Sequence, residues 1–450
     1  MCKEIIEYLL GKNIAILGFG MEGKSTYRFI RKYTDMPLTI IDKNDVRDNN
    51  SDLFEQDSNL DFIVGEDYLN RLDGFDLIIK SPGVITKDID TTNIPFTSQL
   101  ELLLSVNREH VIGITATKGK STTTSLTYEV LRANGIDAKI VGNIGKPIFD
   151  EIENMNKDTY MVVEMSALQL EFITNSPHIS AVLNLYEDHL DHSGTVEHYH
   201  ENKLQIFKHQ TEDDYAIYCS DIEPLNSYID NKYKANKYRV QLSSNEIDSC
   251  TTFVRDNKVY LNEKEIFDLD TELHLLGEHN LRNIMVTLTI SEILGLDLSK
   301  SIEAIANFKP LEHRIELVGK YKDIIFYNDS IATIPTATIS AVKALKSVDT
   351  LIFGGMDRGI DYTELIDFLN SGIVRNLICM PSTGYKIADK ITNNSVYIYR
   401  IESLEEAVKK AKEVTSKEKI CLLSPAAASY EYFKNFEEKG NAYKKMVKEG

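Results

Sequence analysis

The sequence predicts an α/β fold built on parallel sheets and divided among several domains. Short apolar runs alternate with amphipathic helical segments over nearly the whole chain, a pattern typical of parallel strands joined by helices. Glycine-rich turns follow two of these runs, one near residue 18 and one near residue 119. A chain of 450 residues is also too long for a single hydrophobic core.

The composition indicates an enzyme of a reducing compartment. The chain has 50 basic and 69 acidic residues, for a net charge of −19, and it contains no long run of basic residues. This composition argues against a nucleic-acid or anionic-membrane partner. The 5 cysteines are odd in number and form no C-x-x-C pair, as in reduced proteins. Residues 1–13 predict an amphipathic helix and not a signal peptide, and no apolar run approaches the ~20 residues of a bilayer span. We therefore expect a cytoplasmic protein, and a monomer.

The first block, residues 1–107, carries a glycine-rich turn between a strand and a helix. Its expected elements are strands at 13–19, 38–42 and 75–80 and a helix at 22–32. Gly18, Gly20 and Gly23 form a G-x-G-x-x-G at the first strand-to-helix turn, and Asp42 ends the second strand. This pattern is typical of dinucleotide-binding turns, although by itself it also fits a purely structural turn.

The segment Val111–Thr124, VIGITATKGKSTTT, carries the strongest functional signal in the chain. An apolar strand that leads through a glycine turn into a helix presents backbone N–H groups and the positive end of the helix dipole to an anion. Lys120 adds a cation for phosphate oxygens, and Ser121 or Thr122 can offer a hydroxyl to Mg²⁺. The segment therefore predicts nucleoside triphosphate binding, with a plain polar turn as the alternative.

Carboxylates and a histidine follow two later strands of the second block, residues 108–310. Glu164 closes the strand expected at 160–165, and a carboxylate at the carboxyl end of a parallel strand can hold Mg²⁺ beside a bound triphosphate. Asp188, His189 and Asp191 follow the strand expected at 179–185 and could complete a metal site. The alternatives are a strand-terminating Glu164 and a polar loop with helix-capping aspartates. Residues 216–276 are richer in Asn, Asp and Lys, and we expect them to form a peripheral sheet or an excursion from the domain.

Lys203 lies on the apolar stripe of a helix expected at 195–209, together with Val196, Tyr199 and Phe207. A lysine in that position must find an anion, extend its ammonium to solvent, or lose its charge. A neutral amine can react with CO₂ to give a carbamate, which is a carboxylate-like metal ligand. Sequence alone slightly favours the solvent-reaching alternative.

Asn280 and Asn283 stand at the start of another expected helix, where their amides could contact an adenine or cap the helix. In the third block, residues 311–450, Arg314 could reach a phosphate and Asp329 could accept a proton or orient a cation. Strands are expected there at 323–327, 350–353, 375–380, 396–399 and 420–423.

Taken together and in this order, the motifs resemble those of the Mur ligase family over nearly the whole chain. The matching elements are the first G-x-G-x-x-G, Ser81-Pro82-Gly83, TKGKST, GNIG at 142–145, EMSALQLE at 164–171, DHLD, the helix lysine, HN-x-x-N at 279–283, HR at 313–314, NDS at 328–330 and LSPAAAS at 423–429 followed by Phe436. The GNIG and S-x-x-Q-L-E elements are most similar to those of the glutamate-adding members.

The resemblance implies three domains: a Rossmann-like N-terminal domain for a UDP-linked substrate, a P-loop-type central parallel-sheet ATPase domain, and a Rossmann-like C-terminal domain that closes over both. It implies ATP-driven addition of glutamate, with D-glutamate favoured, to UDP-N-acetylmuramoyl-L-alanine through an acyl phosphate. Peptidoglycan precursor synthesis is the expected setting. ATP and Mg²⁺, in two sites, are the expected cofactors.

Residue roles follow from the same resemblance. ATP contacts are expected at Thr117, Lys118, Gly119, Lys120, Ser121, Thr122, Asn280, Asn283, Arg314 and Asp329. One metal is expected at Ser121 and Glu164 and a second at His189 and Lys203, the lysine as its carbamate. Substrate contacts are expected at Gly18, Asp42, Lys43, Ser81, Asn143, Ser166, Thr333, Ser429 and Phe436. Lys120, His189, Lys203, Arg314 and Asp329 are the expected catalytic residues.

Several positions depart from the family pattern. Ala116 and Lys118 stand where Gly and Asn are common in the family, and Ile114 occupies the first glycine position of the general P-loop pattern G-x-x-x-x-G-K-[ST]. Ile331 and Ile334 follow the NDS triplet where a lysine and an asparagine would be expected for a D-glutamate enzyme. A Mur-type ligase that adds L-glutamate is therefore an alternative. A folylpolyglutamate-synthase-like ligase, a nicotinamide-dependent oxidoreductase and a non-catalytic nucleotide-binding protein are further ones.

Overall fold

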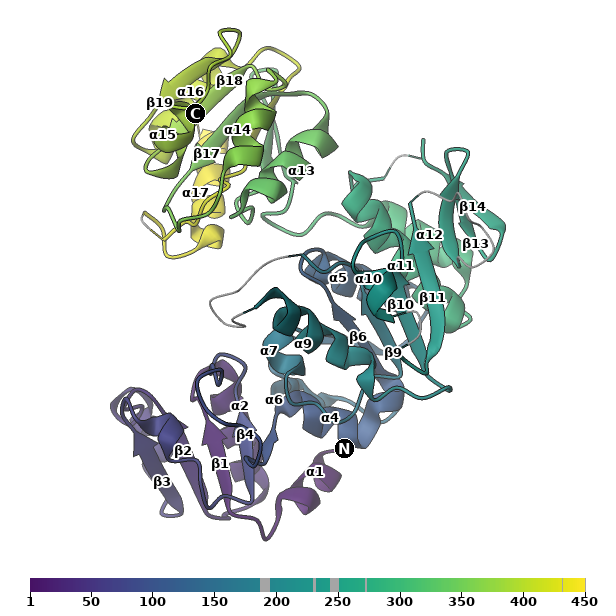
Figure 1. The fold of residues 1–450 in the computed structure, drawn as a ribbon, viewed down its shortest axis with the longest axis vertical. Helices are drawn as coiled ribbons and strands as arrows, with labels where there is room; N and C mark the ends of the chain where they lie inside the picture. Colours follow the sequence, from purple (N-terminus) through teal and green to yellow (C-terminus); the bar gives the residue numbers. More distant parts are fainter. Residues whose placement is uncertain (187–194, 230–231, 243–250, 272, 431, 450) are drawn as a thin grey trace. The chain divides into compact units, whose positions relative to one another are not determined.

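The computed structural model of the chain contains three β-sheets with surrounding helices (Figure 1). It describes residues 1–450 except 187–194, 230–231, 243–250, 272, 431 and 450. The chain divides into two compact units, one of residues 1–272 and 282–307 and one of residues 273–281 and 308–450. The first two sheets belong to the first unit and the third sheet to the second.

The first sheet is parallel and has the strand order β3-β2-β1-β4-β5. Its strands are β1 (Ile14–Leu17), β2 (Leu38–Asp42), β3 (Leu60–Val64), β4 (Leu77–Lys80) and β5 (Phe96–Thr97), and its helices are α1 (Cys2–Leu9), α2 (Met21–Tyr33), α3 (Ser51–Phe54) and α4 (Gln99–Asn107). This order places the turn after β1 beside the point where the chain reverses direction across the sheet, which is where Rossmann-like folds bind nucleotides.

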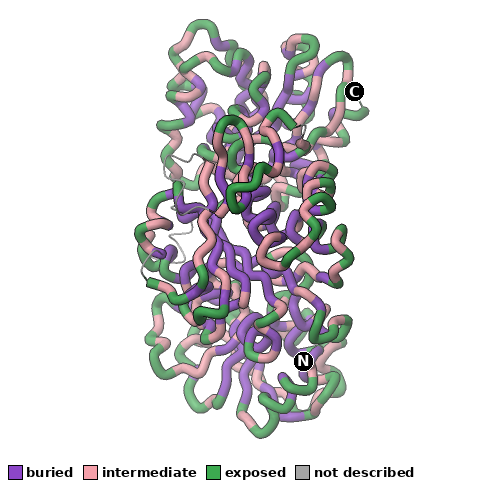
Figure 2. The backbone as a smooth tube through the Cα atoms, turned by 90° about the vertical axis from the view of Figure 1, so that its right-hand side faces the viewer, coloured by how far each residue is buried: buried purple, intermediate pink, exposed green. Residues whose placement is uncertain are grey.

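The central sheet has nine strands in the order β14-β13-β12-β11-β10-β9-β6-β8-β7. They are β6 (Val111–Thr115), β7 (Ala138–Gly142), β8 (Tyr160–Glu164), β9 (Ile179–Val182), β10 (Tyr215–Cys219), β11 (Asn236–Gln241), β12 (Thr252–Arg255), β13 (Lys258–Leu261) and β14 (Lys264–Asp268). The helices are α5 (Lys120–Ala133), α6 (Ile148–Glu151), α7 (Ala167–Leu170), α9 (Val196–Lys208), α10 (Leu225–Ile229), α11 (Glu278–Ile293) and α12 (Leu298–Asn307). The strands at the middle of this sheet are buried (Figure 2).

Residues 216–276, which were expected to form a peripheral sheet or an excursion, form one side of the central sheet, out to its edge. Strand β10 pairs in parallel with β9, and β11 and β12 continue the same sheet before it ends in an antiparallel hairpin pair. The reason is that β10 is apolar enough to be buried along its length, with Ala216, Ile217, Tyr218 and Cys219 fully inaccessible, and so it packs as an interior strand.

The third sheet has the order β15-β16-β20-β17-β18-β19, with only β15 antiparallel to its neighbour. Its strands are β15 (Glu316–Tyr321), β16 (Ile324–Asn328), β17 (Val348–Gly354), β18 (Asn376–Met380), β19 (Tyr397–Arg400) and β20 (Ile420–Leu423). The helices are α13 (Pro335–Leu345), α14 (Thr363–Asn370), α15 (Thr383–Ala388), α16 (Leu404–Val414) and α17 (Phe436–Glu449). Two apolar cores cover its faces, one with α13, α14 and α15 and the other with α16 and α17.

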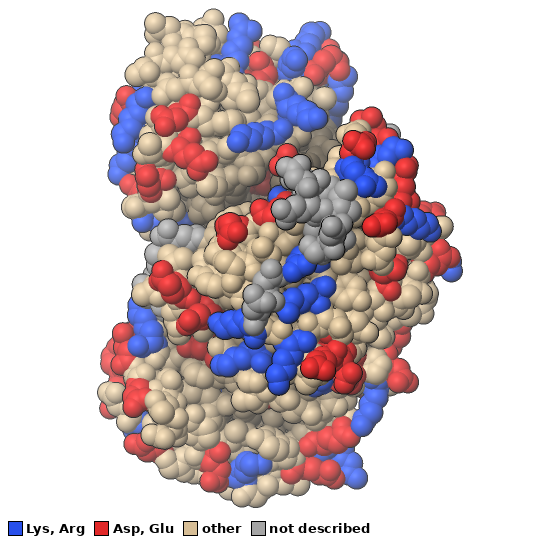
Figure 3. All heavy atoms as spheres, turned by 45° about the vertical axis from the view of Figure 1, so that its right-hand side comes forward, with Lys and Arg blue, Asp and Glu red and all other residues tan. Residues whose placement is uncertain are grey.

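Acidic and basic side chains are intermixed over the face of the molecule that Figure 3 shows. Within the residues that the structure describes, no helix has both the length and the apolar character required to cross a bilayer. The predicted α/β class and its three parallel-rich sheets are confirmed.

Candidate active site

The predicted phosphate loop connects the end of β6 to the start of α5. Gly119 immediately precedes the helix with a φ of +94°, and a Cβ there would lie 2.8 Å from Asn283 Oδ1. The φ favours glycine, because other residues are strained there, and a Cβ would also force the Asn283 side chain to shift. Lys120 folds back over the loop and its ammonium donates to the carbonyls of Ala116, at 3.0 Å, and Thr117, at 3.2 Å. Alanine at position 116, where glycine is usual, therefore still allows the loop to adopt this hydrogen-bonded conformation.

A single asparagine fixes the same loop to the next strand of the sheet. The backbone N–H of Lys118 donates to Asn184 Oδ1 at 2.9 Å, and Asn184 Nδ2 donates back to the carbonyl of Lys118 at 2.8 Å. The Thr117 N–H donates to the Asn184 carbonyl, and the Thr117 hydroxyl accepts from the Tyr186 N–H at 2.9 Å. Sequence reasoning assigned Asn184 no role. Its position directly after a buried strand that neighbours β6 was the available signal.

Glu164 ends β8 beside the phosphate loop, since its partner in the ladder is Ile114 of β6. It is almost completely buried, at 1% exposure. Asn143 Nδ2 donates to Glu164 Oε1 at 2.7 Å, and the Asn143 N–H donates to the Glu164 carbonyl at 3.0 Å. Glu164 Oε2 is buried with no hydrogen-bond partner. A buried, unsatisfied carboxylate oxygen is costly unless a cation satisfies it, so the donor set fits a bound Mg²⁺.

The second expected metal site falls partly outside the described residues, because Asp188, His189 and Asp191 lie in the segment 187–194. Among the residues that are described, no three His, Cys, Asp or Glu side chains lie close enough to hold a metal ion. Lys203 of α9 is described and is 2% exposed, with its ammonium 4.8 Å from the centroid of the Tyr199 ring. The alternative in which the Lys203 ammonium extends to solvent is therefore wrong, because the helix packs against α7, β6 and β9 and Lys203 is buried.

Three of the residues expected to bind substrate are brought together in the first sheet. Gly18 has a φ of +86°, and its carbonyl accepts a hydrogen bond from the Ser81 hydroxyl at 2.8 Å. Asp42 Oδ2 accepts from the Phe19 N–H at 2.7 Å, so the carboxylate holds the glycine turn from its other side. Lys43 is exposed and forms an ion pair with Glu66 at 2.9 Å.

In the second unit, the carboxyl ends of β16 and β20 gather another group of predicted residues. Asp329 follows β16 and accepts hydrogen bonds from the Ser424 hydroxyl at 2.8 Å and the Ile315 N–H at 3.2 Å. Burial raises the pKa of Asp329 to about 7, against the opposing effects of Ser424 and Ile315. Arg314 lies between His313 and Ile315, which adopt φ values of +67° and +45°. Such positive φ values in non-glycine residues are costly and are most common at functional sites.

The residues expected to contact glutamate also lie in this unit. The Thr333 carbonyl accepts from the Arg358 guanidinium at 3.2 Å. Ser429 is 5% exposed, and its hydroxyl is buried without a hydrogen-bond partner. Phe436 meets His313 edge to face, with ring centroids 5.9 Å apart. A buried, unsatisfied hydroxyl beside a turn is consistent with a polar ligand site.

Comparisons with known proteins agree with this arrangement. The profile described as Mur ligase middle domain matches residues 114–291, and that described as Mur ligase, glutamate ligase domain, matches residues 313–427. The UDP-N-acetylmuramoylalanine--D-glutamate ligase of Thermoanaerobacter sp. (strain X514) is 34% identical over 98% of this chain and 99% of its own length. The enzyme of that name from Clostridioides difficile (strain 630) is 32% identical over 98% and 99%.

The chain belongs to the Mur ligase family. Solved structures share its fold: a MurF ligase from Thermotoga maritima in complex with ADP superposes with a TM-score of 0.60 at 16% identity, over 97% of this chain and 94% of that one. The MurC ligase of Thermotoga maritima gives a TM-score of 0.58 at 16% identity, over 97% and 99%.

Asn283 of this Mur ligase lies against Gly119, next to the phosphate loop, whereas the Asn280 amide donates to the Leu276 carbonyl at 2.8 Å. Ser121 and Thr122 are buried in the first turn of α5. Ser166 caps α7 with a capping box that includes Gln169. The roles predicted for all these residues stay predictions.

Proposed function

We propose that this Mur ligase joins D-glutamate to UDP-N-acetylmuramoyl-L-alanine at the expense of ATP. The observation that carries the proposal is full-length similarity, over 98% of the chain, to ligases with this name. The phosphate loop and the buried Glu164 supply the parts that such a reaction needs. Because ATP and a nucleotide-linked precursor are the substrates, we place the reaction in the cytoplasm, within peptidoglycan precursor synthesis, and expect a monomer to perform it.

We assign residues 1–107 to the UDP-linked substrate, 108–310 to ATP and 311–450 to glutamate and closure. In the first step a carboxylate oxygen of the muramoyl-alanine attacks the γ-phosphorus, and the bond from that phosphorus to the bridging oxygen of ADP breaks. In the second step the glutamate amine attacks the acyl carbonyl, phosphate leaves, and the amine loses a proton. Lys120 and the backbone N–H groups after Gly119 are proposed to bind the phosphates.

Mg²⁺ would neutralise charge that accumulates as a carboxylate approaches a triphosphate. The chain offers Ser121 and Glu164 as ligands for one ion and His189 and Lys203 for another, and a carbamate on Lys203 would give it the oxygen donors that this ion prefers. Asn143 orients Glu164. Arg314 and Asp329 are proposed to act on the ATP side, and Thr333, Ser429 and Phe436 to contact glutamate.

A ligase that adds L-glutamate is a second candidate because of one specific feature. Ile331 and Ile334 follow the Asn328-Asp329-Ser330 triplet, and both are only partly buried. Apolar side chains cannot pair with a glutamate carboxylate, so this region must recognise the amino acid differently from enzymes that carry polar residues there.

The test is phosphate release by the purified protein with ATP, Mg²⁺ and UDP-N-acetylmuramoyl-L-alanine, comparing D-glutamate with L-glutamate. Product mass identifies the amide bond, and hydrolysis followed by chiral analysis identifies the enantiomer. Turnover with D-glutamate supports the proposal, and turnover with L-glutamate alone selects the second candidate. Failure to release phosphate with either enantiomer would overturn both.

A further inference from the structure

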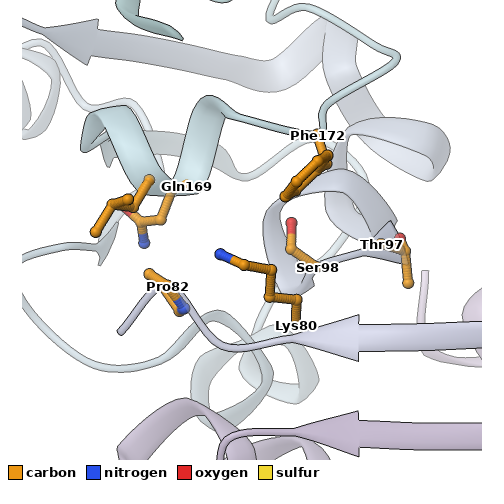
Figure 4. Close-up of a pocket in the computed structure, with 7 residues that line it drawn as sticks. Lys80, Pro82, Thr97, Ser98, Gln169 and Phe172 are labelled. Atoms are coloured by element: carbon orange, nitrogen blue, oxygen red, sulfur yellow. The ribbon is translucent and has the colours of Figure 1, made fainter. Parts of the chain in front are cut away.

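One buried lysine and two partly buried glutamates lie together where the first and central sheets of the first unit meet. Lys80 ends β4, Glu22 lies in the first turn of α2, and Glu171 follows α7. The Lys80 side chain is 3% exposed, and its ammonium lies 3.5 Å from Glu171 Oε2 without a direct hydrogen-bond partner. Figure 4 shows that ammonium pointing into a small cavity between Pro82, Ser98 and Gln169. The proposed mechanism uses none of these charges.

The cluster is electrostatically interdependent. Burial raises the pKa of Glu22 to about 7, and the Lys80 charge opposes that rise. Burial lowers the pKa of Lys80, and the charges of Glu171 and Glu22 oppose that fall. Removal of one member therefore leaves a buried charge without compensation, which is far more costly than removal of an oppositely charged pair.

Gln169 connects this cluster to a predicted substrate contact. Its Nε2 donates to Glu22 Oε1 at 3.1 Å, and its Oε1 accepts from both the N–H and the hydroxyl of Ser166, at 3.0 and 3.1 Å. Helix α7 has only 4 residues and cannot be stable by itself, so this capping box contributes much of the hydrogen bonding that holds it. The position of Ser166 therefore depends on where Glu22 is held.

Lys80 and Glu22 also lie next to the remaining substrate turns of the first unit in the sequence. Lys80 precedes Ser81, whose hydroxyl donates to the Gly18 carbonyl at 2.8 Å. Glu22 belongs to the G-x-G-x-x-G segment, in which Gly23 approaches Gly18 so closely that a Cβ would lie 2.1 Å from the Gly18 carbonyl oxygen. Three stretches distant in sequence thus share one buried charge cluster.

We infer that Lys80 is a positioning residue for the UDP-linked substrate: its ion pair with Glu171 and its charge interaction with Glu22 hold the Gly18 turn, the Ser81 turn and the Ser166 capping box in one arrangement. The inference rests on the proposed function for the identity of that substrate. Within the part of the chain that the structure describes, Lys80 interacts with Glu171, Phe172 and Glu22 and makes no ion pair or hydrogen bond with the phosphate loop. Its loss should therefore affect the muramoyl nucleotide and spare ATP.

The test compares Lys80→Met, Lys80→Arg and the paired variant Lys80→Met with Glu171→Gln, which removes one charge of each sign. Steady-state kinetics give the KM values for ATP and for UDP-N-acetylmuramoyl-L-alanine. We expect Lys80→Met and the paired variant to raise the KM of the muramoyl nucleotide by about tenfold or more, with the KM of ATP within about twofold of wild type. Lys80→Arg should recover part of the loss. Lys157→Met, at an exposed lysine of the same unit, is the matched control.

If Lys80→Met fails to fold, the paired variant decides. A paired variant with wild-type KM for both substrates, or with both raised equally, overturns the inference. If the wild-type protein itself shows no turnover, the proposed function has failed, and amide hydrogen exchange tests the inference without ligand. Exchange at residues 166–171 should then be faster in the paired variant than in wild type, and unchanged exchange there overturns the inference.

Discussion

Asn143 Nδ2 donates a hydrogen bond to Glu164 Oε1 across 2.7 Å, which leaves the second carboxylate oxygen of Glu164 buried and unsatisfied. The amide thereby fixes the carboxylate at the end of β8, next to the strand that leads into the phosphate loop. A carboxylate held in this way can bind a cation without reorganising, and fixed partners of this kind strengthen metal sites. The pair therefore identifies Glu164 as the residue where metal dependence should be tested.

Glu164→Gln should weaken Mg²⁺ activation while leaving the fold intact. Glutamine keeps the size of the side chain and an acceptor for Asn143, but it removes the negative charge that attracts the ion. We expect the Mg²⁺ concentration for half-maximal activity to rise by about 10–100-fold. The measurement is phosphate release against Mg²⁺ concentration at saturating substrates.

The exposed Glu55→Gln in the same unit is the control and should give the wild-type Mg²⁺ curve. An unchanged Mg²⁺ requirement in Glu164→Gln would remove this residue from the metal site.

Lys120→Met should abolish turnover through loss of ATP phosphate binding. Methionine keeps most of the length of the side chain without its charge, and the loop keeps its Asn184 contacts at Lys118, so the fold should persist. We expect turnover to fall by at least about 100-fold, the range seen when one electrostatic donor to a transition state is lost. Turnover and ADP binding by calorimetry measure the effect. Lys300→Met, at an exposed position on α12, should behave as wild type, and an active Lys120→Met protein would contradict the assignment.

Lys203→Ala should lose activity, and a small carboxylic acid should partly restore it. The lysine is buried on α9, where a carbamate would supply a carboxylate to a metal, and a free acid can occupy the space that alanine leaves. We expect a loss of about 100-fold. The measurement is turnover against added acetate, with and without bicarbonate. Lys203→Arg cannot form a carbamate and is the second variant. Wild-type activity in either variant would exclude the metal-ligand role.

Much of the fold could be predicted because the residue pattern within a single segment was enough to identify its secondary structure. The strand at 38–42 was expected with the bounds that β2 has, since turn residues limit a β-branched run on both sides. The helix at 195–209 was expected because its apolar residues repeat at helical spacing, and α9 begins one residue later. Gly119 was predicted from its motif, and its φ of +94° shows why the motif needs it.

Other features depend on partners that are distant in sequence. Strand β15 lies at the edge of the third sheet and runs antiparallel to β16. Its direction depends on that pairing and could not be predicted from its own residues. Lys80 and Glu22 are ordinary charged residues in sequence, and only folding buries Lys80 beside Glu171 and brings Glu22 close to it. Lys439 likewise is 2% exposed and donates to the Gly354 carbonyl at 3.0 Å, which no local pattern indicates. Tertiary burial, and not local propensity, determines each of these.

Asp329→Asn should change how stability depends on pH. Burial raises the folded pKa of Asp329 to about 7, above its ordinary value of 3.8. The stability that the protonated form contributes is therefore present below about pH 4 and lost as pH rises through 7. Asparagine cannot ionise, so the variant should gain stability relative to wild type by up to about 3 kcal/mol between pH 5 and pH 8. Urea unfolding at both pH values measures this gain. Asp367→Asn, at an exposed position on α14, is the control, and an equal difference at both pH values would contradict the prediction.

Gly440→Ala should destabilise the second unit and disturb the residues around Arg314. Gly440 lies on α17, and a Cβ there would come within 2.3 Å of His313 Nδ1 and 2.4 Å of Ser330 Oγ. His313 cannot retreat easily, because its Nδ1 also meets Asn328 Nδ2 at 2.9 Å and its ring packs on Phe436. Overpacking of this kind costs about 1–3 kcal/mol, which outweighs the better helix propensity of alanine.

The measurement for Gly440→Ala is the urea midpoint of unfolding, together with the KM of glutamate. Lys445→Ala, at an exposed position on the same helix, is the matched control, because it introduces alanine without a steric conflict. We expect a lower midpoint and a raised KM in Gly440→Ala alone. A stability equal to that of the control would contradict the prediction, because it would mean that His313 and Ser330 move aside freely. The close packing of α17 on residues 328–330 would then have no role in holding Arg314 and Asp329 in place.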